Sequence, residues 1–178
     1  MHRRLGRCLR VLQSTPVRVN FILDPHCSEP AIYIKDFSDI HVQDAQYITF
    51  YYIAEELLHA VQHQSFYHEQ MNPKYKNYEF EVYVFRDLAY GIANKIALND
   101  PDKPYYPGAI YTAFQPDDPY YSTYKAWMEK LIDYGYFPTG EQATFNQICE
   151  HWRAISAEVI PNFYPQLLRK FFNKPQKP

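Results

Sequence analysis

The sequence predicts an α+β fold that is mostly helical, with a small N-terminal β-sheet and helices in the C-terminal half. Two observations predict this class. Two short segments rich in β-branched residues occur within the first 34 residues, and several longer segments with helical periodicity follow, separated by proline, glycine and asparagine. The chain has 178 residues, the length of one domain, so we expect a single domain over 1–178.

The N-terminal part of the chain predicts one short helix and two strands. Leucines at helical spacing between arginines indicate an amphipathic helix over 1–15 that ends before Pro16. Residues 17–23 alternate in polarity and are β-branched, and residues 31–34 repeat this character after a turn. We expect these two strands to belong to one small sheet.

Two long helices are expected next. Asp44 is placed to cap the first, which runs from about 45 to 67, and Asn72-Pro73 then forces a turn. The second runs from about 78 to 98 and ends at the stop signal Asn99-Asp100-Pro101. Because the turn that joins them is short, we expect the two helices to lie side by side.

The remaining sequence predicts a loop and three helices. Proline and tyrosine are concentrated in 99–121, with too much proline for regular structure, and we expect this Tyr/Pro-rich loop to fold over or beside the first long helix. Helices are expected at 122–134, 140–159 and 164–172, bounded by glycine and proline. The chain thus divides into a motif-bearing half, 17–98, and a helical half, 122–178.

Charge, hydropathy and cysteine content argue against a nucleic-acid-binding, membrane-spanning or disulfide-rich protein. The formal net charge is −2, whereas a domain that binds nucleic acid would be more basic. The longest charge-free apolar stretch is too short to cross a membrane, and no secretory signal is recognisable. The three cysteines include no C-x-x-C pair, which argues against a disulfide framework and favours a reducing, cytoplasmic location.

The most informative segment lies in the first long helix. Successive residues of a helix are rotated by about 100°, so four side chains share about one quadrant of its surface: Glu55, Glu56, His59 and His63. Such a face is often only solvated. Here the flanking residues are apolar nearly all round, which indicates a buried helix, and buried carboxylates and imidazoles need partners.

The second long helix offers a partner carboxylate. Glu79 and Glu81 precede an apolar run, and either could face the histidines of the first helix. Helical periodicity places Glu81 on the face of Val84 and Leu88, and Glu79 on a different face. Periodicity alone does not choose between the two glutamates.

These residues resemble the motifs of zincin metallopeptidases of the gluzincin branch. The segment Glu55-Glu56-Leu57-Leu58-His59 is similar to H-E-x-x-H, with glutamate in place of the first histidine. The segment Glu79-Phe80-Glu81-Val82-Tyr83-Val84-Phe85 resembles E-F-x-A-[D/N]-x-F of the second helix. The resemblance covers roughly 17–98.

The resemblance implies a zincin-like domain that hydrolyses peptide bonds with zinc or another divalent metal. It makes His59 and Glu79 metal ligands, gives Glu55 the place of the missing ligand, and makes Glu56 the general base. A site with Glu55 would be harder and more anionic than a two-histidine site, and its bound water less acidic. This predicts a metallopeptidase-like protein with weakened or lost catalysis, acting on a peptide or protein.

Two other interpretations stay open. His59 and His63 have the i, i+4 spacing by which a helix presents two imidazoles to zinc, but Ala60 follows His59, so this set has no adjacent general base and would be structural or regulatory. Alternatively, the Glu/His quadrant is a buried hydrogen-bond network, and the chain is a non-enzymatic domain that binds a protein partner through its aromatic surface.

Overall fold

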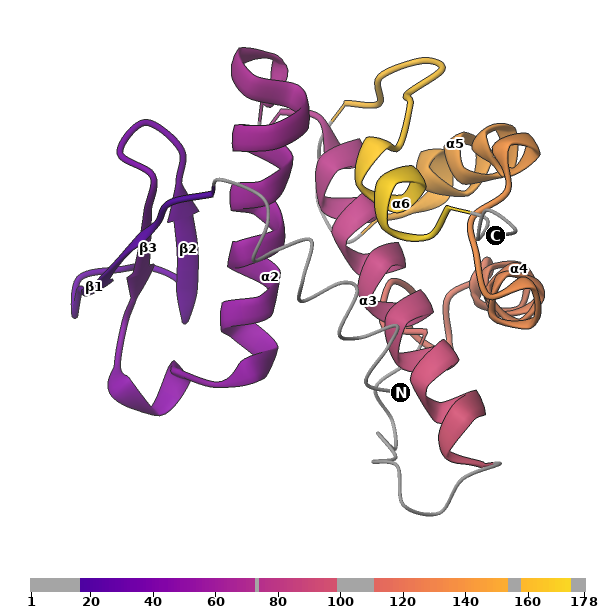
Figure 1. The fold of residues 1–178 in the computed structure, drawn as a ribbon, viewed down its shortest axis with the longest axis horizontal. Helices are drawn as coiled ribbons and strands as arrows, with labels where there is room; N and C mark the ends of the chain where they lie inside the picture. Colours follow the sequence, from indigo (N-terminus) through magenta and orange to yellow (C-terminus); the bar gives the residue numbers. More distant parts are fainter. Residues whose placement is uncertain (1–16, 73, 99–110, 154–157, 174–178) are drawn as a thin grey trace, which may run out of the picture. The chain divides into compact units, whose positions relative to one another are not determined.

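The computed structural model describes residues 17–72, 74–98, 111–153 and 158–173 (Figure 1). Its class is α+β and mostly helical, as the sequence predicts. The described residues form two compact units, 17–72 and 74–173 with the gaps just given. The helix expected over 1–15 and the first part of the Tyr/Pro-rich loop, 99–110, lie outside the described residues.

The first unit contains a three-stranded sheet of β1 (Asn20–Leu23), β2 (Ala31–Ile34) and β3 (Asp39–Val42). The strand order is β1-β3-β2, with β3 parallel to β1 and antiparallel to β2. Both predicted strands, β1 and β2, are therefore present, but each pairs with β3 and not with the other. The central strand β3 is not predicted, because its four residues include only two apolar side chains, Ile40 and Val42, and both of these are buried.

The segment after the sheet is less regular than the single helix expected over 45–67. It consists of the 3-10 turn η1 (Ala45–Tyr47), the helix α2 (Phe50–Val61), the π-helix η2 (Gln62–Tyr67) and the 3-10 turn η3 (His68–Gln70). The Asp44 carboxylate accepts a hydrogen bond from the Gln46 N–H, so it caps η1 and not the long helix. The N-cap residue of α2 is Thr49.

Helix α2 packs against β2 (Figure 1). The core beneath it contains Ala31, Ile40 and Val42 of the sheet, and apolar side chains of α2 lie against these residues, among them Ile53 and Leu57. Burial of such side chains contributes about 25 cal/mol for each Å² of apolar surface removed from water. This packing fixes which sides of α2 face the sheet.

The second unit is built on α3 (Lys76–Ala97), against which α4 (Tyr121–Tyr134), α5 (Gln142–His151) and α6 (Gln166–Phe171) pack. The 3-10 turn η4 (Thr139–Glu141) precedes α5. The bounds of α3 and α4 agree with the prediction within two residues. Helix α5 is shorter than predicted: the chain becomes extended at Trp152, and Glu158 forms a β-bridge with Tyr75.

Aromatic packing on α3 forms the centre of this unit. Phe80 is fully buried, and its ring lies 5.0 to 6.3 Å, centroid to centroid, from those of Phe114, Tyr124, Phe145 and Trp152. These ring distances are those of favourable aromatic pairs. Further along α3, a Cβ atom on Gly91 would collide with the end of the Ile132 side chain in α4, so a larger residue there would force Ile132 to move.

A buried carboxylate joins α3 to residues 112–113 and to α4. Asp87 is fully buried and accepts hydrogen bonds from Thr112 Oγ1 at 2.7 Å, the Tyr124 hydroxyl at 2.6 Å and the Ala113 N–H at 3.3 Å. Burial raises the pKa of Asp87 above its ordinary value of 3.8, although these donors act in the opposite direction.

None of the helices formed by the described residues has the combination of length and apolar character needed to cross a membrane.

The raised pKa of Asp87 predicts how stability depends on pH. The folded protein binds the Asp87 proton more tightly than the unfolded chain, so this residue's contribution to stability falls as the pH rises from about 3.8 through the folded-state pKa. Asp87→Asn keeps an acceptor oxygen but does not titrate. The free energy of unfolding of the wild type, relative to that of Asp87→Asn, should therefore decrease with rising pH. Urea unfolding of both proteins between pH 4 and 8 checks this, and a difference that stays constant or increases would contradict it.

Candidate metal centre

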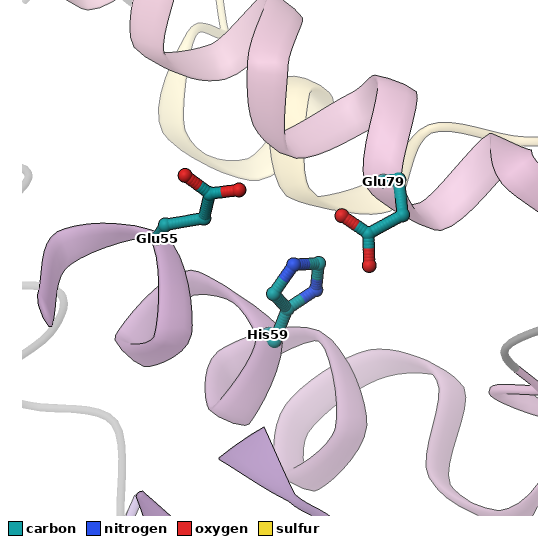
Figure 2. Close-up of side chains that lie close together, drawn as sticks. All are labelled: Glu55, His59 and Glu79. Carbon is teal, nitrogen blue, oxygen red and sulfur yellow. The ribbon is translucent and has the colours of Figure 1, made fainter. Parts of the chain in front are cut away.

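Glu55 and His59 are one helical turn apart in α2, and their side chains extend from the same side of the helix (Figure 2). Glu55 is half-buried, and His59 is only 5% exposed. The His59 Nδ1 atom lies 3.1 Å from the Gln62 carbonyl oxygen, Oε1. A carbonyl oxygen only accepts, so Nδ1 is the donor in this contact, and in the neutral imidazole Nε2 then keeps the lone pair that a metal ion needs. Metal-binding histidines commonly have this arrangement, with the second ring nitrogen donating to a fixed acceptor.

One group of three side chains that could hold a metal ion occurs among the described residues. It consists of Glu55, His59 and Glu79, and one ligand atom from each lies within 4.8 Å of the other two (Figure 2). Glu79 belongs to the first turn of α3 and is half-buried. These three residues are the metal ligands that the resemblance implies.

Glu56, the residue that the resemblance makes a general base, is held by the sheet. Its Oε2 atom accepts a hydrogen bond from the backbone N–H of Tyr33 in β2, at 2.6 Å. Glu56 is not in the three-residue group. The partner Tyr33 is missed by sequence reasoning, because nothing in its local sequence connects it to a residue 23 positions away.

His63 lies in the π-helix that follows α2 and contacts the same tyrosine. Its Nδ1 atom is 3.1 Å from the Tyr33 hydroxyl, which also accepts a hydrogen bond from Gln64 Nε2 at 3.2 Å. His63 is not part of the three-residue group either. The i, i+4 pairing of His59 with His63 assumes a regular α-helix, whereas the helix widens from Gln62 onward.

Glu81 has a different structural role from Glu79. Its side chain is fully buried, and its Oε1 atom accepts hydrogen bonds from the N–H groups of Leu167 at 2.8 Å and Leu168 at 3.3 Å. These are backbone donors in the first turn of α6, which have no acceptor within their own helix. Of the two candidate glutamates, Glu79 belongs to the three-residue group and Glu81 caps α6.

Alanine substitutions should separate the roles of these two glutamates. Glu81→Ala leaves two buried N–H groups without their acceptor and should lower the free energy of unfolding by about 2 kcal/mol or more. Glu79→Ala is the matched control, because the half-buried Glu79 side chain should contribute roughly 1 kcal/mol or less. Urea unfolding without added metal measures both values. Equal losses would show that Glu81 does not hold α6 as described.

No protein-family model, curated protein or solved structure matches this chain. The likeness to gluzincin helices therefore rests on the residues of the two motifs alone.

Proposed function

We propose that this protein is a metallopeptidase-like protein that binds zinc or another divalent metal ion through Glu55, His59 and Glu79. The observation that carries the proposal is the proximity of the three ligand atoms. Two carboxylates and one imidazole are ligand types that zinc accepts, and three protein ligands are the usual number at a catalytic zinc site. The fixed Nδ1–H of His59 adds support, because it leaves Nε2 for the metal.

The donor set determines what the proposed site does chemically. A bound divalent ion would act as a Lewis acid toward water or a peptide carbonyl. Glu55 and Glu79 together bring two negative charges, one more than two histidines and one glutamate would bring. This extra negative charge would reduce the Lewis acidity of the ion and make its bound water less acidic. Slow peptide hydrolysis, or none, is therefore expected.

Glu56 is the residue we propose to take up a proton during peptide hydrolysis. In the H-E-x-x-H pattern, the carboxylate that follows the first ligand position is the general base, and Glu56 has that position here. Its hydrogen bond from the Tyr33 N–H fixes its orientation, but this bond also stabilises the charged, unprotonated form. Both Glu55 and this hydrogen bond therefore act in the direction of weak catalysis.

A specific observation favours the alternative of a non-enzymatic protein-interaction domain. Strand β1 is at the edge of the sheet, and its Phe21 and Leu23 side chains are 56% and 60% exposed. Neighbouring exposed apolar side chains on an edge strand are typical of surfaces that bind other proteins. In that case the Glu/His residues would be a hydrogen-bond network that binds no metal.

Metal titration of three proteins distinguishes these functions. The wild type should bind zinc, Glu55→His should bind it more tightly because it restores the second imidazole, and His59→Ala should lose binding. Isothermal titration calorimetry measures the affinities. Circular dichroism of His59→Ala controls for misfolding. Negligible zinc binding by both the wild type and Glu55→His would reject the proposed metal site.

Hydrolysis should depend on Glu55 and Glu56 together. Glu55→His should hydrolyse a mixture of quenched fluorescent peptides faster than the wild type, because the water bound to its zinc ion would be more acidic. Adding Glu56→Gln to this variant should remove hydrolysis but keep the zinc, since an amide does not accept the proton. A double variant as active as Glu55→His would show that Glu56 is not the base.

A further inference from the structure

The second unit contains a pocket of about 470 Å³ that the metal site does not use. Part of its wall is aromatic and includes Tyr83 in α3, Phe114, and Trp152 just after α5. The ring centroids of Tyr83 and Trp152 are 5.4 Å apart, and Trp152 Nε1 donates a hydrogen bond to the Ala113 carbonyl at 2.6 Å, which fixes the indole ring. Contacts within the folded unit therefore hold this aromatic wall in place.

Acidic side chains outnumber basic ones among the described residues that line the pocket. Of these residues, two are acidic, Asp117 and Asp118, and one is basic, Arg153. Asp118 Oδ1 accepts a hydrogen bond from the Tyr120 N–H at 2.7 Å, so this carboxylate is held in place. Among the residues that the structure describes, neither Asp117 nor Arg153 has an ion-pair partner. The described side chains that line the pocket have a formal net charge of −1.

These features favour a cationic ligand over an anionic one. Aromatic rings attract ammonium and guanidinium groups, and the two carboxylates act in the same direction. An example within the protein is Arg86, whose guanidinium carbon is 5.4 Å from the Tyr83 ring centroid. A pocket for a carboxylate or phosphate would need the opposite balance of charges.

We propose that this pocket binds the side chain of a lysine or arginine in a peptide. Tyr83 is four residues after Glu79 in the same helix, so the aromatic wall and the proposed metal ligand lie one turn apart on α3. A peptide whose basic side chain occupies the pocket would extend along α3 toward Glu79. The pocket's preference for a cation stands on its own, whereas its role as a substrate subsite rests on the proposed function.

Binding of three small probes to the full chain tests the preference. N-acetyl-lysinamide should produce saturable shifts of the Trp152 indole resonance in NMR spectra, with this resonance assigned from Trp152→Phe. N-acetyl-norleucinamide has a similar shape without the charge. It should bind at least about fivefold more weakly than the lysine probe. Absence of saturable binding by the lysine probe, equal binding of the two probes, or tighter binding of N-acetyl-glutamate would each overturn the proposal.

Charge variants give the direction of the effect. Asp117→Asn should weaken binding of the lysine probe by about two- to fivefold, and Arg153→Gln should strengthen it by a similar factor. Equal affinities of these two variants would also overturn the proposal. Zinc titration of the same variants should match that of the wild type, so loss of the lysine preference with zinc binding intact rejects only the pocket. A wild-type protein that binds the lysine probe but binds no added zinc would instead reject only the metal site.

Discussion

The arrangement of the second unit depends on hydrogen bonds to the buried carboxylates of α3. This helix is enclosed by α4, α5 and α6, and an ionised carboxylate without donors would be too costly inside such a core. Glu81 obtains its donors from the first turn of α6, and Asp87 obtains them from Thr112, Ala113 and Tyr124. Each acid therefore attaches a segment distant in sequence to α3. Apolar packing around Phe80 supplies the driving force, and the carboxylates determine which segments attach where.

In the first unit, Tyr33 has a comparable role. Its backbone N–H binds Glu56, and its hydroxyl contacts both His63 and Gln64, so one residue of β2 is connected to three residues of α2 and of the π-helix that follows. These contacts account for polar side chains on the sheet-facing part of an otherwise apolar helix. They also separate the four residues of the Glu/His quadrant into two sets, because Glu56 and His63 contact Tyr33 whereas Glu55 and His59 belong to the group with Glu79.

The proposed functions follow from side-chain chemistry in two places. Two carboxylates and an oriented imidazole suit a divalent cation, and aromatic rings with an excess of carboxylates suit an organic cation. The shared element is α3, which contributes Glu79 to the first site and Tyr83 to the second. Under the two proposals together, the ligand is a peptide with a carbonyl at the metal site and a basic side chain in the pocket.

Features that depend on neighbouring residues can be predicted from the sequence. Helical periodicity was sufficient to predict α3 and α4 and to place Glu55 and His59 on one side of a helix, and β-branched alternation was sufficient for β1 and β2. The position of β3 between those strands, the capping of a 3-10 turn by Asp44 and the capping of α6 by Glu81 become known only from the folded structure. The physical reason is the distance along the chain to the deciding partner. Leu167 lies 86 residues from Glu81, and no local pattern encodes a hydrogen bond over that separation.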